Sequence, residues 1–269
     1  MPELPEVETT CRGIAPQVVG QRIERILLRE RRLRWPISAE VAGLEGTRIT
    51  GVSRRAKYLL MPLERGHLIW HLGMSGSMRV LPVGSPAATH EHVEFQLANG
   101  QALKFRDPRR FGALLYCEQD PLQHRLLRAL GPEPLGDEFD ADYLYARCRG
   151  RSVAIKTLIM NGHIVVGVGN IYASEALYLA GIRPTRAAGR IGKARIARLV
   201  EAIRTILGAA IAQGGTTLQD FTQADGKPGY FRQALQVYAN RGQCPACGKA
   251  IRHLVQGQRS SYYCPGCQT

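Results

Sequence analysis

The feature that most constrains the fold is a pair of cysteine knuckles near the end of the sequence. Cys244-x-x-Cys247 and Cys264-x-x-Cys267 stand sixteen residues apart. Each knuckle presents two thiolates to one ion, and four thiolates complete a closed tetrahedral zinc site. A redox pair or two disulfides are the alternative interpretations, and the doubled spacing favours zinc. Because no coordination position stays open, we expect one Zn²⁺ with a structural role.

The predicted zinc would fix the hairpin "KAIRHLVQGQRSSYY" between the knuckles. This hairpin carries Arg252, His253 and Arg259, and in a basic protein a phosphate contact is the function we expect for them. The other cysteines are scattered and read as ordinary thiols of a reducing compartment. They are Cys11, Cys117 and Cys148.

The charge balance indicates an acidic partner. The chain has 269 residues, with 36 Lys and Arg against 22 Asp and Glu, a net charge of +14. Such an excess is typical of nucleic-acid binding, although a merely basic soluble enzyme is the alternative. The basic clusters are spread along the chain, so a fold could gather them on one face. They are residues 29–34, 54–57, 106–110 and 147–151.

Composition places the chain among globular proteins. Hydrophobic residues make up 45%, which is enough to bury a core in one compact unit or in two to three small ones. No apolar run is long enough to cross a bilayer, and the first residues lack the pattern of a signal peptide. We therefore expect a soluble, intracellular protein with no membrane association.

The hydrophobic pattern changes twice along the chain. Residues 5 to about 18 have helical spacing, with Pro5 suited to the first turn. From about 22 to 117 short alternating runs predict strands, with a hairpin turn at Asn99-Gly100. These runs favour an antiparallel sandwich.

The second half reads as helical. Residues 130–140 resemble a linker, and the pattern then stays helical to about 213, where a glycine pair ends it. Residues 214–233 are polar and glycine-rich, which suggests a mobile loop. The last thirty residues form a separate unit.

The stretch 155–184 predicts two helical segments around Gly167-Val168-Gly169-Asn170. Glycines allow close backbone approach to a ligand, and the helix that follows directs free N–H groups at an anion. We expect Asn170 to cap this helix, which runs to about Leu179. A capped turn without a ligand is the alternative interpretation.

Ordered motifs from Pro2 to the final cysteine resemble one known family. They are "PELPEVE", "RRAKYLL", "HLGMSGSMR", "DPRRFGA", "VVGVGNIYASEAL", "DGKPGYFRQALQVY" and "CPACG…YYCPGCQ". Together they are similar to the bacterial formamidopyrimidine-DNA glycosylases, which repair oxidised purines such as 8-oxoguanine. The resemblance implies an α+β fold in three parts: an antiparallel β-sandwich with a flanking helix over 1–130, a helix–two-turn–helix domain with a lesion-recognition loop over 131–235, and a zinc finger over 236–269.

The resemblance also implies the chemistry of the N-terminus. Removal of Met1 is expected and leaves Pro2 as a secondary amine, which is partly unprotonated at neutral pH. Attack on the sugar C1′ would expel the damaged base and form an iminium, from which β,δ-elimination cleaves the abasic site. Glu3 would donate a proton to the deoxyribose, which requires a raised pKa supplied by burial or by neighbouring Glu6.

The remaining site residues follow from the same resemblance. Lys57 would contact DNA and assist the first elimination, and Arg259 would bind phosphate and assist the second. Met74, Arg109 and Phe111 would fill the gap left by the flipped nucleotide. The other implied DNA contacts are His71, His90, Arg151, Lys156 and Asn170. From the residues alone, Met74 and Phe111 would be core residues and the two histidines structural.

Two positions depart from the family pattern. A lysine is common where this chain has Arg151, so the charge is kept while the geometry changes. Asn161-Gly162 replaces an acidic version of that turn, which affects the local turn shape. Lesion selectivity is expected in the loop 215–230, through backbone N–H groups and Thr216 or Thr217.

Three rival interpretations make different demands on the sequence. Endonuclease VIII, which acts on oxidised pyrimidines, shares the proline and the zinc finger but usually begins Pro-Glu-Gly-Pro, whereas this chain has Leu4. A catalytically silent damage binder would lack Pro2, Glu3 or Lys57. A zinc-ribbon transcription factor explains the cysteines but not the first eight residues. The expected protein is thus a monomeric, bifunctional repair enzyme on damaged double-stranded DNA, cytoplasmic and associated with the nucleoid.

Overall fold

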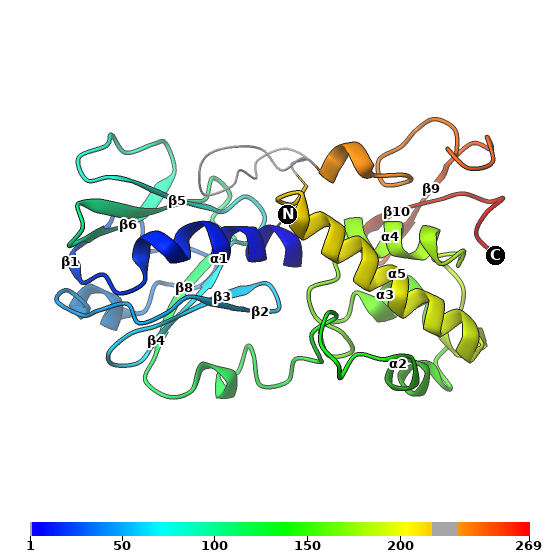
Figure 1. Cartoon of the computed structure of the whole chain (residues 1–269), viewed down its shortest axis with the longest axis horizontal. Coiled ribbons are helices and arrows are strands. Elements are labelled where there is room, and N and C mark those ends of the chain that lie inside the picture. Colours follow the sequence, from blue (N-terminus) through cyan, green and yellow to red (C-terminus); the bar gives the residue numbers. More distant parts are fainter. Residues whose placement is uncertain (1, 217–230) are drawn as a thin grey trace. The chain divides into compact units, whose positions relative to one another are not determined.

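The computed structural model describes residues 2–216 and 231–269. The chain divides into two units (Figure 1). Unit 1 comprises residues 1–128 and 213–232, and unit 2 comprises residues 129–212 and 233–269. Among the described helices, none combines the length and the apolar composition that a bilayer span requires.

Unit 1 is built on two antiparallel four-stranded sheets. The first has the strand order β1-β6-β7-β5 and the second the order β2-β3-β4-β8. The strands are β1 (Ile23–Leu28), β2 (Ser53–Arg55), β3 (Tyr58–Pro62), β4 (His67–His71), β5 (Ser77–Pro82), β6 (Glu91–Leu97), β7 (Gln101–Arg106) and β8 (Ala113–Cys117). The predicted antiparallel sandwich is confirmed.

The predicted hairpin turn at Asn99-Gly100 is also confirmed, since it joins β6 to β7. Gly100 has φ of 76°, and the Asn99 side chain accepts a hydrogen bond from the Gln101 N–H at 3.1 Å. A left-handed glycine after an asparagine is what a tight hairpin turn requires.

Aromatic side chains fill the space between the two sheets. Trp70 on β4 packs edge-on against Phe95 on β6 and Phe105 on β7, with ring centroids 5.7 and 5.4 Å apart. All three side chains are buried. Edge-to-face contacts of this kind add to the hydrophobic burial that holds the layers together.

Helix α1 (Leu4–Val18) covers strands of both sheets (Figure 1). Its buried apolar positions include Val7, Cys11, Ile14 and Val18, which recur at helical spacing. Pro5 lies in the first turn, as predicted. Two 3₁₀ turns complete the described secondary structure of residues 2–128, η1 (Ala39–Gly43) and η2 (Pro121–Gln123).

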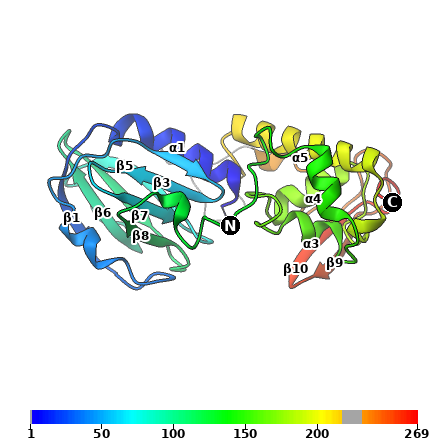
Figure 2. The same ribbon diagram turned by 90° about the horizontal axis from the view of Figure 1, so that it is seen from below.

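Unit 2 is helical apart from one hairpin. Helix α4 packs against both α5 and strand β10 of the hairpin (Figure 2). The elements are α2 (Ala141–Cys148), α3 (Ile155–Ile159), α4 (Asn170–Leu179), η3 (Ala188–Arg190), α5 (Lys193–Ala212), η4 (Phe231–Ala234, which spans the division between the units), β9 (Arg252–Gln256) and β10 (Arg259–Tyr263). The helical second half and the hairpin between the knuckles are confirmed.

The prediction that Asn170 caps α4 is wrong. Gly169 is the N-cap residue and makes no side-chain cap hydrogen bond, and Asn170 is the first residue of the helix. The Asn170 amide oxygen accepts a hydrogen bond from Lys156 Nζ at 2.7 Å. A buried ammonium needs oxygen partners, which explains why the amide oxygen faces Lys156.

Candidate DNA-repair site

The N-terminal turn of α1 is buried and held by Glu6. Pro2 is buried, and Glu3 and Glu6 are only 2% and 1% exposed. The Glu3 N–H donates to Glu6 Oε2 at 2.7 Å. The Thr216 N–H donates to the other carboxylate oxygen, Glu6 Oε1, also at 2.7 Å. One carboxylate therefore fixes both the residue next to Pro2 and the backbone at Thr216.

Thr216 stands at the edge of the part of the chain that the structure describes. Gly214 and Gly215, which end the helical pattern as predicted, have φ of 73° and 82°. The Phe231 N–H donates to the Gly215 carbonyl at 3.1 Å. The two stretches of chain that lead into and out of the predicted lesion-recognition loop are thus tied together. Thr217 and residues 218–230, which the sequence assigned to that loop, lie outside the described residues.

Lys57 occupies a two-residue turn between β2 and β3. Arg55 pairs with Tyr58 across the hairpin, so Ala56 and Lys57 form the turn. Ala56 has φ of 55°, a left-handed conformation that costs a non-glycine residue roughly 1–2 kcal/mol. The turn places Lys57, which is half-buried, at the tip of the hairpin.

An arginine links this turn to α1. Arg54 donates through Nε to Glu8 Oε2 at 2.8 Å and through Nη1 to the Ala56 carbonyl at 3.0 Å. Burial alone would raise the pKa of Glu8, but hydrogen bonds from Arg54 and Arg12 outweigh it and lower that pKa. Helix α1, which Glu3 precedes as N-cap residue, and the turn that carries Lys57 are therefore joined by a partly buried ion pair.

His71 ends β4 with its imidazole neutral. Its Nδ1 accepts the Gly73 N–H at 2.9 Å, which leaves the proton on Nε2. Burial, followed by repulsion from Lys57 and Arg34, lowers the pKa of His71 to about 4. At neutral pH the ring can therefore donate one hydrogen bond from Nε2 but carries no charge, which suits a positioned contact to a phosphate oxygen.

The three predicted wedge residues lie on two adjoining loops of unit 1, here called the wedge loops. Residues 72–76, between β4 and β5, carry Met74, and residues 107–112, between β7 and β8, carry Arg109 and Phe111. Arg109 and Phe111 are exposed, with the guanidinium 5.1 Å from the ring centroid, and Met74 is half-buried. A Cβ on Gly73 would lie 2.4 Å from the Gly112 backbone nitrogen, so the loops are in backbone contact. His90 is exposed, with φ of 67°. The structure thus brings the wedge residues together, and Phe111 is not the core residue that its type alone suggests.

In unit 2, Lys156 lies at the centre of a buried polar cluster. It is 2% exposed, and its Nζ donates to Asn170 Oδ1 at 2.7 Å and to the Ser260 carbonyl and Ser261 Oγ at 2.8 Å each. Ser260 and Ser261 follow Arg259, which is exposed at the start of β10. Lys156 and Asn170 therefore hold the strand that begins with Arg259.

Arg151 lines a basic hollow of about 620 Å³ that contains no acidic side chain. Its lining residues are Arg149, Gly150, Arg151, Ser152, Ala187, Gly189 and Arg190. Guanidinium groups gathered without carboxylates favour an anion, and a phosphodiester is the anion that Arg recognises well.

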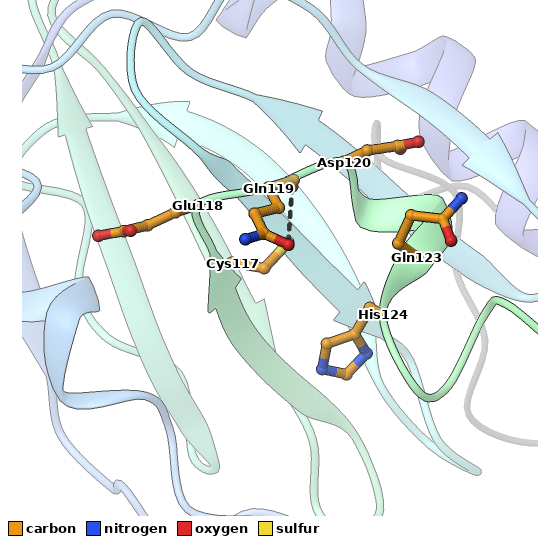
Figure 3. Close-up of a pocket in the computed structure, with 6 residues that line it drawn as sticks. All are labelled: Cys117, Glu118, Gln119, Asp120, Gln123 and His124. Atoms are coloured by element: carbon orange, nitrogen blue, oxygen red, sulfur yellow. Dashed lines mark hydrogen bonds between the residues drawn. The ribbon is translucent and has the colours of Figure 1, made fainter.

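A second hollow, at the end of β8, has a different character. Its volume is about 300 Å³, and it is lined by Cys117, Glu118, Gln119, Asp120, Gln123 and His124. Figure 3 shows Glu118 and Asp120 pointing away from each other, with the Cys117 thiol bonded to the Gln119 carbonyl at 3.6 Å. It contains none of the predicted site residues, and its acids would repel a phosphate.

The four knuckle cysteines converge as a zinc site requires. Their sulfur atoms all lie within 4.8 Å of one another. The Cys244–Cys267 and Cys247–Cys264 pairs are 3.8 and 3.3 Å apart, close to the edge of about 3.8 Å in a tetrahedron with Zn–S bonds of about 2.3 Å. Tyr178 OH lies 3.2 Å from Cys244 Sγ and supports it from α4. The cluster holds one structural zinc ion. Cys11, Cys117 and Cys148 are free, as expected.

Sequence reasoning missed part of this arrangement. It did not assign a role to Ser75 or Asp107, both buried between the wedge loops, nor a bridging role to Glu6. Asp107 stood within the quoted motif "DPRRFGA", but an aspartate before a proline reads as a turn residue. Only the packing of the two loops shows that its carboxylate is buried.

Comparisons with known proteins cover the whole chain. Residues 1–114 match the model of the formamidopyrimidine-DNA glycosylase N-terminal domain. Residues 130–222 match the H2TH domain of the same enzymes, and residues 243–269 match a zinc finger found in FPG and IleRS. Formamidopyrimidine-DNA glycosylases of Stutzerimonas stutzeri and Pseudomonas aeruginosa are 59% and 58% identical over 270 residues, with 100% of each chain covered.

Solved structures give the same picture. The fold is similar to that of the Lactococcus lactis Fpg in complex with DNA containing an abasic site, with a TM-score of 0.93, 32% identity and 100% of both chains covered. It is also similar to the MutM (FPG) protein of Thermus thermophilus, with a TM-score of 0.89 and 38% identity over 99% of this chain and 98% of that one.

Proposed function

The chain belongs to the formamidopyrimidine-DNA glycosylase family, and from that membership we propose that Pro2, Glu3, Lys57 and Arg259 carry out the family's reaction here. The protein is a base-excision repair enzyme, a DNA glycosylase that also cleaves at abasic sites. It acts on damaged double-stranded DNA and holds one structural zinc ion, and we propose that it does so as a monomer.

The assignment of roles rests on one observation: the Glu6 carboxylate accepts hydrogen bonds from both the Glu3 N–H and the Thr216 N–H. It holds the N-terminal turn in one position, and a positioned nucleophile lowers the entropic part of the barrier. A secondary amine at the chain terminus titrates at roughly pH 8, so part of it is nucleophilic at neutral pH. With Met1 removed, Pro2 would attack C1′ and expel the oxidised purine.

The next steps use the neighbours of Pro2. Attack by the amine and opening of the sugar ring form an iminium, which draws electrons and so assists loss of the two phosphates by β,δ-elimination. Glu3 would give a proton to the ring oxygen. Lys57, on the turn that Arg54 ties to α1, would assist the first elimination, and Arg259 the second.

The DNA contacts are proposed in the same way. The basic hollow of Arg151 and the neutral donor His71 support phosphate contacts. We propose that Lys156 and Asn170 serve DNA binding by holding the strand that begins with Arg259. The exposed side chains of Arg109 and Phe111, with half-buried Met74 next to them, support a wedge that enters the duplex, with His90 beside it. We propose the division 1–130, 131–235 and 236–269 as the functional domains, and a cytoplasmic location at the nucleoid, where the chromosomal substrate is.

A lesion panel tests the proposal against the pyrimidine-specific alternative. Duplexes carrying 8-oxoguanine or a formamidopyrimidine should be nicked, with both 3′- and 5′-phosphate ends, and duplexes carrying an oxidised pyrimidine should be cleaved far more slowly. Pro2→Gly should lose excision and Glu3→Gln should lose most of it, while both still bind an abasic-site duplex. Equal cleavage of purine and pyrimidine lesions would contradict the purine assignment.

A further inference from the structure

We infer that Asp107, together with Ser75, is the positioning centre that holds the wedge loops in the geometry needed to enter DNA. The inference rests on the proposed function, because it concerns how Met74, Arg109 and Phe111 are presented to the duplex. Neither Asp107 nor Ser75 needs to touch DNA for this role. They act through the loops that they join.

The side chain of Asp107 connects the two loops directly. It is fully buried, at 0% exposure, and Ser75 is 1% exposed. Asp107 Oδ1 accepts the Ser75 hydroxyl at 2.7 Å, and Oδ2 accepts the Gly112 N–H at 2.7 Å. Ser75 Oγ in turn accepts the Arg109 N–H at 3.1 Å. Ser75, which follows Met74, is thus hydrogen-bonded to the backbone of Arg109. Gly112, which follows Phe111, is hydrogen-bonded to Asp107.

The backbone of Asp107 extends the network to His90. Its N–H donates to the His90 carbonyl at 3.0 Å, and its carbonyl accepts from His92 Nε2 at 2.8 Å and from the Arg110 N–H at 3.1 Å. His90 and Arg110 have φ of 67° and 55°. Non-glycine residues keep such conformations only where surrounding contacts enforce them, and Asp107 supplies one contact to each.

The loops also leave no room to move separately. A Cβ on Gly112 would lie 2.8 Å from the His71 carbonyl and 2.9 Å from Asp107 Oδ2. Together with the contact between Gly73 and Gly112, this makes the two loops one rigid base. Phe111 is nevertheless 43% exposed on top of it. A rigid base under exposed apolar and cationic side chains is what insertion into a base stack requires.

The role of Asp107 is geometric rather than electrostatic. Its carboxylate oxygens accept hydrogen bonds from the Ser75 hydroxyl and the Gly112 N–H. Within the described part of the chain, neither oxygen is paired with a cationic side chain. An asparagine with its oxygen toward Gly112 and its amide toward Ser75 would keep both links. Alanine would remove both and leave the Gly112 N–H without its acceptor, a costly loss at a buried site.

The experiment compares Ser75→Ala, Asp107→Ala and Asp107→Asn with the parent protein. A fluorescent base analogue beside 8-oxoguanine reports wedge insertion by stopped flow, and excision is followed in single turnover. A separate duplex with a preformed abasic site reports the lyase reaction without eviction of a base. Glu94→Gln is the matched control, because Glu94 is a buried carboxylate on β6 that pairs with Lys104 and Arg29.

Ser75→Ala and Asp107→Ala should slow insertion and excision by about tenfold or more, since small misplacements near a reacting centre have large effects. Their abasic-site cleavage should stay within about threefold of the parent, and Asp107→Asn should recover insertion. Glu94→Gln should lower the melting temperature and leave insertion unchanged. Ser75→Ala covers the case in which Asp107→Ala does not fold.

Several results would overturn the inference. One is a Ser75→Ala protein that inserts its wedge at the parental rate. Another is an alanine variant that loses excision and abasic-site cleavage equally while insertion stays intact. A third is an Asp107→Asn protein that inserts no better than Asp107→Ala. A parent protein that neither excises 8-oxoguanine nor cleaves abasic sites would instead contradict the proposed function, so the two failures are distinguishable.

Discussion

Glu6 and Thr216, which lie at opposite ends of unit 1 in sequence, are joined by a 2.7 Å hydrogen bond from the Thr216 N–H to Glu6 Oε1. The same carboxylate binds the Glu3 N–H. A Cβ on Gly215, whose φ is 82°, would lie 2.9 Å from Glu6 Oε1. The chain that leads to the lesion-recognition loop is therefore fastened to the turn that carries the proposed nucleophile.

The first prediction concerns this bridge. Glu6→Gln keeps one acceptor but turns an amide N–H₂ toward a backbone N–H, so one of the two bonds is lost. Because the site is buried, we expect a loss of stability of about 1–3 kcal/mol and slower excision of 8-oxoguanine. Urea unfolding and single-turnover excision measure the two effects. A Glu6→Gln protein with unchanged stability and excision would show that the bridge has no consequence.

The second prediction distinguishes a structural role for Lys156 from a phosphate-binding role for Arg151, by protein stability and by the salt dependence of DNA binding. All three protons of the Lys156 ammonium have acceptors within the protein, so Lys156→Met should lower stability and zinc retention. Arg151→Gln removes an exposed charge, so it should leave stability unchanged and reduce the slope of log K against log salt by about 1. Fluorescence anisotropy on an abasic-site duplex gives the slopes. A stability loss confined to Arg151→Gln would reverse the two assignments.

The third prediction concerns zinc. Removal of the ion by a chelator, or the Cys247→Ser substitution, should unfold the hairpin that carries Arg259, because a short hairpin has little core of its own. DNA binding should be lost with the metal and return when zinc is restored. Metal content and anisotropy are the measurements. Cys117 is a free thiol outside the cluster, so the Cys117→Ser protein should retain both zinc and DNA binding. Full DNA binding by a zinc-free protein would be incompatible with the account.

The fourth prediction follows from the pKa of His71, which burial lowers from about 6.5 to about 4. The folded state favours the neutral ring, so this contribution to stability is complete above pH 6.5 and is lost as the pH falls through about 4. His71→Gln should flatten this part of the stability curve by on the order of 2–3 kcal/mol. Urea midpoints from pH 7 to pH 4 provide the comparison. Identical acid sensitivity in parent and variant would exclude His71 as the cause.

The sequence predicted those features whose causes are local. The Asn99-Gly100 turn, the pairing of β6 with β7 and the cysteine cluster depend on residues close together in the chain, and each is present. The apolar face of α5 likewise follows from helical periodicity.

Features that depend on distant partners could not be predicted. Asn170 was expected to cap α4, but the buried ammonium of Lys156 takes its amide oxygen. The role of Asp107 depends on Ser75, 32 residues earlier in the chain, and that of Glu6 on Thr216, 210 residues later. No local pattern reports such pairs, because the tertiary fold alone brings them together.

The most direct test of the central claim is borohydride trapping. Protein confirmed to start at Pro2 and to hold zinc is incubated with duplex DNA carrying 8-oxoguanine opposite cytosine, and then reduced. We expect a covalent protein–DNA complex whose cross-link maps to Pro2 and is absent from Pro2→Gly. No complex, or a cross-link that maps to Lys57 instead, would contradict the proposal that the N-terminal proline is the nucleophile.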